Sequence, residues 1–125
     1  MRQVIATNGA PKAIGPYSQA IRANGFIFVS GQTPIDPATQ QLISGSIAEQ
    51  TERVLRNIEA ILQQAGSSMA KIVRCGVFLK DMNDFAAMNE VYAKFFPNDP
   101  PARSTVQAAR LPKDCQVEID AIALE

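Results

Sequence analysis

The chain has 125 residues, with twelve basic and twelve acidic side chains and no histidine. This length favours one domain, residues 1–125, which can bury a real core but is too short for two independent ones. The balanced charge argues against nucleic acid or a membrane surface as a partner, and the lack of histidine removes the commonest metal ligand and general base.

The first third of the chain is predicted to form short strands and a surface loop. Strands are expected at residues 3–7, 19–22 and 26–30. Asn24-Gly25 joins the last two and is a dipeptide favoured in tight hairpin turns. Residues 33–45 are rich in Pro, Gln, Ser and Gly, which indicates a surface excursion, with a short strand at Leu42-Ile43.

A long amphipathic helix follows. Ser46 and Glu49 form a capping-box pattern, in which each side chain accepts a free amide of the first helical turn. Apolar residues then recur at helical spacing until Gly66, which is expected to end the helix. Two ion pairs one turn apart, Glu49/Arg53 and Glu52/Arg56, are predicted on its outer side.

The second half of the chain alternates strands with one more helix. Residues 71–80 are predicted to be a strand whose dry face carries Val73, Cys75, Val77 and Leu79. Residues 84–96 are predicted to be a helix whose core-facing residues are Phe85, Met88, Tyr92 and Phe95. Residues 104–108 and 116–124 complete the set of strands.

Helices that lie between strands predict an α+β fold in which both helices cover one face of a mixed sheet. On the last strand Val117, Ile119, Ala121 and Ala123 would then face the helices. The uncovered face would carry Ile72, Phe78 and Ile122, an apolar patch that favours self-association.

Arg103 and Glu118 are the candidate site residues. Two adjacent prolines precede Arg103 and hold the backbone extended, so the arginine projects from a rigid segment. Its planar guanidinium is suited to bind a carboxylate with two hydrogen bonds. Glu118 lies in the last predicted strand. We expect it to face the same ligand-binding cleft as Arg103 and to interact with water there. The structural alternatives are a surface salt bridge for Arg103 and a lysine pair for Glu118.

The apolar frame around these two residues resembles the signature of the RidA (YjgF) family of reactive-intermediate imine deaminases. The matching positions are Pro101 to Ser104, Val106, Leu111 and Val117 to Ile119. Three further blocks match in the same order, at residues 15–20, at residues 29–37, and from residue 81 to residue 92. The resemblance therefore extends over nearly the whole chain.

The resemblance implies a chorismate-mutase-like fold and a homotrimer with clefts between subunits. It implies cofactor-free hydrolysis of 2-imino acids, such as 2-iminopropanoate and 2-iminobutanoate, and of their enamine tautomers to 2-oxo acids and ammonia. Arg103 would anchor the substrate carboxylate and Glu118 would orient or activate the attacking water. Tyr17, Ser30 and the Gly31 amide match other cleft positions, although loop packing or a strand-ending cap would also explain the first two.

Many family members have a cysteine where this chain has Thr105, so thiol chemistry is excluded there, and Thr105 is expected to supply backbone groups to the substrate. Asn89 matches a family block too, but a helical asparagine is interpreted as a backbone brace and is left out of the site. Cys75 and Cys115 fit neither a zinc motif nor a redox pair, and we expect both to be reduced.

Two other functions remain open. Some relatives are described as ribonucleases that inhibit translation, although neutral charge and few aromatic residues give RNA little to bind. A non-catalytic trimer that binds small carboxylates as a regulator would use the same Arg103. Only a catalytic role of Glu118 would distinguish an enzyme from a protein that merely binds carboxylates.

Overall fold

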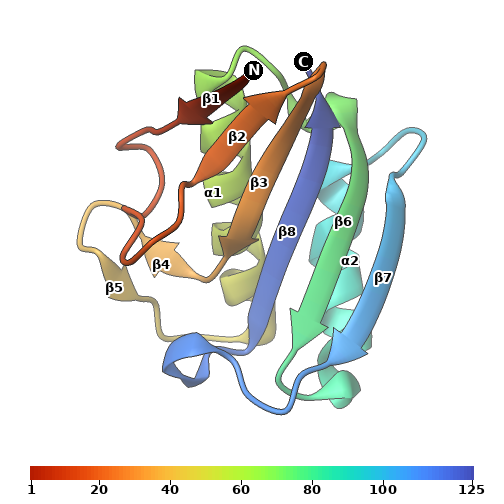
Figure 1. Ribbon diagram of the computed structural model, residues 1–125. Coiled ribbons are helices and arrows are strands. Elements are labelled where there is room, and N and C mark those ends of the chain that lie inside the picture. The colour runs from red at the N-terminus through yellow and green to blue at the C-terminus, as the bar shows by residue number, and fades with distance from the viewer.

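The computed structural model describes all 125 residues as a six-stranded sheet covered by two helices (Figure 1). The sheet strands are β1 (Arg2–Ile5), β2 (Ala20–Ala23), β3 (Phe26–Gln32), β6 (Ile72–Leu79), β7 (Ala102–Gln107) and β8 (Val117–Leu124). The helices are α1 (Ile47–Gln64) and α2 (Phe85–Phe95), and β4 (Ile35–Asp36) pairs with β5 (Gln41–Leu42). Short 3-10 turns span Met69–Lys71, Met82–Asp84 and Pro112–Asp114.

The strand order β1-β2-β3-β8-β6-β7 makes the sheet mixed. All neighbours are antiparallel except β6 and β7, which run parallel. Both helices lie behind the sheet in Figure 1, on the same face, as the sequence predicts. Val117, Ile119, Ala121 and Ala123 are all buried beneath them, which confirms the predicted inner face of β8.

Local signals in the sequence place the first hairpin and α1. Asn24 and Gly25 both have positive φ, 51° and 84°, the geometry that a two-residue hairpin turn requires. The Ser46 hydroxyl accepts the Glu49 amide at 3.2 Å, and the Glu49 carboxylate accepts the Ser46 amide at 3.1 Å. The predicted capping box is therefore confirmed, and Gly66 follows the helix at a φ of 78°.

One of the two predicted ion pairs on α1 is wrong. Glu52 lies 3.9 Å from Arg56 as expected, but Glu49 does not reach Arg53 because its carboxylate caps the helix. Arg53 donates instead to the Asn57 side chain at 3.1 Å.

Two predicted core positions are also corrected. A bulge in the pairing of β6 with β8 reverses the alternation at the start of β6, so Ile72 is buried and Val73 is 40% exposed. On α2, Met88 and Tyr92 are buried as predicted, whereas Phe85 is 37% exposed. Phe85 lies in the first turn of α2, where its ring contacts Arg103 rather than the core.

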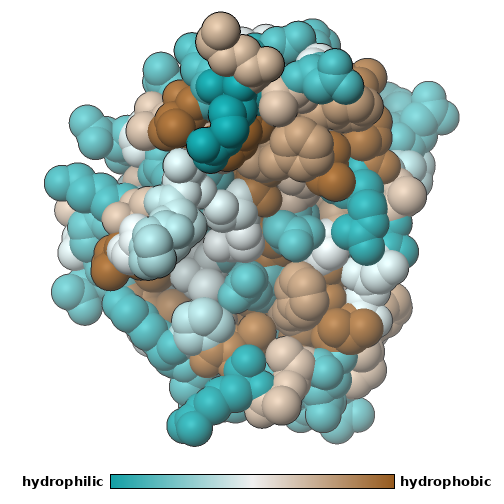
Figure 2. All heavy atoms as spheres, viewed as in Figure 1, coloured by the Kyte–Doolittle hydropathy of each residue, from teal (hydrophilic) through white to brown (hydrophobic).

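The face of the sheet opposite the helices carries exposed apolar side chains. Figure 2 shows this face, with apolar and polar residues interspersed. Phe28 is 44% exposed and Val106 is 47% exposed, and Phe78 and Ile122 are partly exposed. The half-apolar outer face is thus as predicted, except that Ile72 belongs to the core. Neither helix has the length and apolar character needed to cross a membrane.

Candidate functional site

Arg103 is the second residue of the edge strand β7, and Ala102 separates it from Pro100 and Pro101. Parallel pairing sets it in register with Cys75 of β6, whose side chain is fully buried, so Arg103 points to the face that the helices cover. There the Arg103 Nη1 donates to the Asn89 Oδ1 at 2.7 Å. Its Cζ lies 4.7 Å from the ring centroid of Tyr92 and 5.4 Å from that of Phe85.

The Arg103 guanidinium is half-buried but has no ionic partner within the chain. None of the four ion pairs of the structure involves Arg103. It lines a cavity of about 410 Å³, together with Asn89, Tyr92, Ala93, Phe96, Pro100 and Pro101. A cation that is oriented but not neutralised at the mouth of a partly apolar cavity is suited to bind an anion.

The groups beneath Arg103 are uncharged. Burial raises the pKa of the Cys75 thiol and of the Tyr92 hydroxyl, so both carry their protons near neutral pH. The Thr105 hydroxyl is buried without a hydrogen-bond partner, as is that of Tyr92. Cys75 is therefore a poor nucleophile, and the charge at this site comes from Arg103 alone.

Glu118 lies on the opposite face of the sheet. Its neighbours Val117 and Ile119 are buried under the helices, so alternation along β8 directs Glu118 to the uncovered face. Gly31 of β3 lies against it, since a Cβ atom at Gly31 would collide with the Glu118 carboxylate. Desolvation, and secondarily the charge of Asp120, raises the pKa of Glu118 above its usual range.

Ser30 is adjacent to Gly31 on β3, and Tyr17 lies in the loop that precedes β2. The Ser30 hydroxyl donates to the Ser18 carbonyl at 2.6 Å, which ties β3 to the loop that precedes β2. The Tyr17 side chain projects from this loop and is 51% exposed. Its hydroxyl accepts the Ile14 amide at 3.2 Å, so the ring is held in place although it is exposed.

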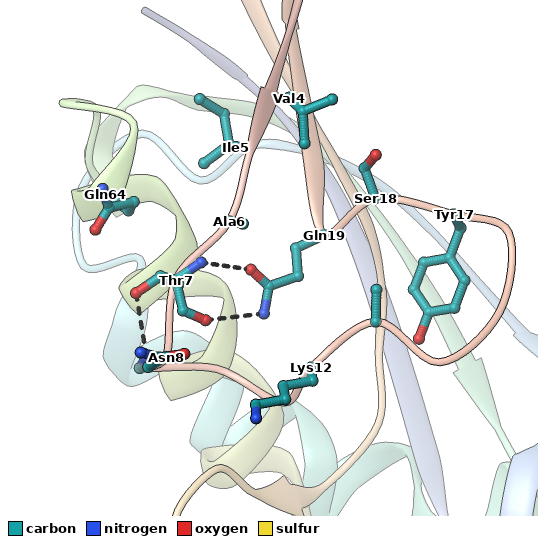
Figure 3. Close-up of a pocket in the computed structure, with 12 residues that line it drawn as sticks. Val4, Ile5, Ala6, Thr7, Asn8, Lys12, Tyr17, Ser18, Gln19 and Gln64 are labelled. Carbon is teal, nitrogen blue, oxygen red and sulfur yellow. Dashed lines mark hydrogen bonds between the residues drawn. The ribbon is translucent and has the colours of Figure 1, made fainter.

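A cavity of about 690 Å³ also lies at this loop (Figure 3). Gln19 crosses it and braces the loop. Its Oε1 accepts the Thr7 amide at 2.7 Å, while its Nε2 donates to the Pro11 carbonyl at 2.7 Å. These bonds occupy the polar groups of Gln19, so its role here is structural. Tyr17 lines the same cavity.

The sequence-predicted site residues fall into two groups that do not meet within one chain. Arg103 and Thr105 lie on β7 at one edge of the sheet, on the helix side. Glu118 and Gly31 lie on the uncovered face, and the loop that carries Tyr17 joins β1 and β2 at the other edge. Within a single chain Arg103 and Glu118 therefore do not share a cleft, because strand register directs their side chains to opposite faces. A shared cleft between subunits, which the family resemblance implies, stays a prediction.

Asn89 belongs to the site, contrary to its interpretation as a backbone brace. Its amide oxygen accepts from Arg103 rather than from the helix backbone. The spacing of Phe85, Asn89 and Tyr92, four and three residues apart, puts all three on one face of α2. That spacing is the signal in the sequence from which the arginine-binding face can be recognised.

The comparisons with known proteins agree with this architecture. The family described as Endoribonuclease L-PSP matches residues 7–125, and the chain belongs to it. A RutC family protein of Pyrococcus horikoshii is 56% identical over 123 residues, which cover 98% of each chain. The human 2-iminobutanoate/2-iminopropanoate deaminase is 44% identical over 125 residues, covering all of this chain and 91% of its own.

A solved structure is similar over nearly its full length. It is that of Escherichia coli TdcF with bound serine, which has a TM-score of 0.94, 44% sequence identity and 98% coverage of both chains. The resemblance to the RidA (YjgF) family is thus confirmed. Family membership supports a deaminase activity that acts on reactive intermediates.

Proposed function

We propose that this protein hydrolyses small 2-imino acids, such as 2-iminopropanoate and 2-iminobutanoate, and their enamine tautomers to 2-oxo acids and ammonia without a cofactor. The observation that carries the proposal is Arg103, a half-buried guanidinium that Asn89 orients at 2.7 Å and that no carboxylate of the chain neutralises. The human relative is named for this reaction, and TdcF is described with serine bound, a small amino acid that carries a carboxylate.

The reaction asks for few protein groups. Water adds to the imine carbon, a proton passes to the nitrogen, and the carbon–nitrogen bond breaks, which leaves a carbonyl and ammonia. Arg103 would fix the substrate by its carboxylate, with two parallel hydrogen bonds. Glu118 would orient the water and accept its proton, a role that favours a carboxylate with a raised pKa. Orientation of this kind can supply much of the acceleration.

We propose further that the site forms between two copies of the chain. Arg103 and Glu118 lie on opposite faces of one sheet, so a single substrate can contact both only if they come from different subunits. The exposed apolar side chains of the uncovered face, with Phe28 at 44% and Val106 at 47% exposure, favour such an assembly. Tyr17, Ser30 and Gly31 would then join Glu118 on one wall, and Thr105 would join Arg103 on the other.

The assembly predicts a homotrimer in solution, the state that the family resemblance implies. Light scattering coupled to gel filtration at micromolar concentration is expected to give three times the 13.5 kDa of one chain. A stable monomer at this concentration would contradict both the trimer and any site shared between subunits.

A coupled assay tests the activity itself. A pyridoxal-phosphate dehydratase that acts on serine or threonine generates the imine, and release of the 2-oxo acid is followed over time. We expect the rate to rise in proportion to the amount of added protein, and we expect Arg103→Ala to remove this increase. A rate equal to the uncatalysed hydrolysis at every protein concentration would refute the proposal.

The description of the matching family as an endoribonuclease favours a second candidate, RNA cleavage. The chain has a net charge of zero, which supplies no field to attract a polyanion. We therefore rank this activity below imine hydrolysis. Cleavage of single-stranded RNA by the purified protein that persists in Arg103→Ala but not in a mock purification would support it.

A further inference from the structure

Helix α2 presents one stripe of side chains to Arg103. Phe85 and Tyr92 place their rings against the guanidinium, with centroids 5.4 and 4.7 Å from its Cζ. Asn89 lies between them in the helix and accepts the Nη1 hydrogen at 2.7 Å, the one polar contact in the stripe. The two rings restrict the plane of the guanidinium, and the amide oxygen fixes its rotation within that plane.

The hydrogen-bond acceptor in this stripe, the Asn89 amide oxygen, is uncharged, so it does not neutralise Arg103. Two other arginines of the chain are paired with carboxylates, Arg22 with Glu125 and Arg56 with Glu59, each at 3.0 Å. A carboxylate in place of Asn89 would hold Arg103 as firmly, but it would also cancel the charge that attracts a ligand. In a half-buried site this cancellation is weakly screened by water. An amide fixes the guanidinium and leaves its charge available.

We propose that Asn89 is a positioning residue, which aims the remaining N–H donors of Arg103 at the ligand carboxylate and must be uncharged to do so. This role rests on the proposed function, because it presumes that Arg103 binds a carboxylate. Asn89 itself touches Arg103 and need not touch the substrate. Its effect should therefore appear in ligand affinity and KM, and only weakly in kcat.

The test compares Asn89→Asp with Asn89→Ala, using calorimetric titration with 2-oxobutanoate on the full-length protein. Asn89→Asp is expected to weaken binding by about ten- to a hundredfold at neutral pH, because the new carboxylate competes with the ligand for Arg103. Asn89→Ala, which loses orientation but keeps the charge, is expected to weaken it by about two- to tenfold. Asn83→Asp adds the same charge just before α2 with no contact to Arg103, and it should bind as the unchanged protein does.

A pH series separates positioning from a general structural role. As pH falls, the introduced carboxylate of Asn89→Asp takes up a proton and stops neutralising Arg103, so the affinity of this variant should approach that of Asn89→Ala. The affinities of Asn89→Ala and Asn83→Asp should not rise in this way as pH falls. A merely structural defect would leave the ratio between the two Asn89 variants unchanged with pH.

The outcomes distinguish this inference from the proposed function. If Arg103→Ala loses 2-oxobutanoate while both Asn89 variants retain full affinity, the role of Asn89 is wrong and carboxylate binding by Arg103 stands. If Arg103→Ala itself binds normally, both fail. If Asn89→Asp does not fold, Asn89→Ala decides alone: a weaker affinity with unchanged kcat supports the proposal, and an unchanged affinity overturns it.

Discussion

Replacement of Arg103 by alanine is expected to abolish binding of 2-oxo acids while leaving the fold intact. Removal of the side chain loses its contacts with Asn89, Phe85 and Tyr92. Arg103 makes no ion pair within the chain and lies on an edge strand outside the buried core, so the substitution should leave the fold intact. It would, however, remove two charge-assisted hydrogen bonds to the ligand, a loss in affinity of at least about a hundredfold. Titration with 2-oxobutanoate, with circular dichroism as a check of the fold, measures both effects.

Arg103→Lys is the matched variant for this prediction. An ammonium retains the charge but lacks the planar guanidinium geometry. It cannot donate to the Asn89 oxygen and to both oxygens of a carboxylate in one plane. We expect it to lose most of the affinity that alanine loses. Arg110→Ala, a substitution at an exposed arginine, controls for the loss of one positive charge. Unchanged affinity in Arg103→Ala or in Arg103→Lys would contradict the assignment of Arg103 as the carboxylate anchor.

The parts of the fold that the sequence predicts well are those that local chemistry determines. Asn24-Gly25 accepts the positive φ angles of its turn, and Ser46 with Glu49 satisfies the free amides at the start of α1. The inner face of β8 follows from strict alternation. Each of these signals lies within a few residues of the feature that it specifies, so no knowledge of distant contacts is needed.

The errors arise where distant parts of the chain decide the outcome. The bulge that buries Ile72 and exposes Val73 depends on the pairing of Ile72 with Ala123 of β8, which is distant in sequence. Phe85 fits the helical apolar pattern, yet its ring contacts Arg103 of β7. The separation of Arg103 from Glu118 likewise depends on which face each strand turns toward the helices, and the spacing of the two residues in sequence carries no such information.

The resemblance to a family and the physical arrangement contribute differently to the site. The resemblance names six residues as cleft positions and implies that the clefts lie between subunits: Arg103, Glu118, Tyr17, Ser30, Gly31 and Thr105. Strand register places Arg103 and Glu118 on opposite faces of the sheet, so the proposed chemistry requires two copies of the chain to contribute to one site. Asn89 also matches a family block, but its contact with Arg103 is evident only from the structure.

Substitution of glutamine for Glu118 is expected to preserve binding and to reduce turnover by roughly two to four powers of ten, the range for loss of a general acid or base. The change keeps the shape of the side chain beside Gly31 but removes its ability to accept a proton. Titration with 2-oxobutanoate and the dehydratase-coupled assay, both on the same preparation, separate the two effects.

The pH dependence gives a second readout of the same residue. Desolvation raises the pKa of Glu118, and a general base must be ionised, so kcat/KM should fall as pH decreases through a pKa above the usual range for glutamate. In Glu118→Gln the reaction should be slower, and this fall of kcat/KM at low pH, the acidic limb of the pH profile, should be absent. Asp120→Asn removes the neighbouring charge that also raises this pKa, so its acidic limb should move to lower pH. A carboxylate-binding regulator would show neither effect, and full deaminase activity in Glu118→Gln would mean that Arg103 and the backbone amides perform the reaction without this carboxylate.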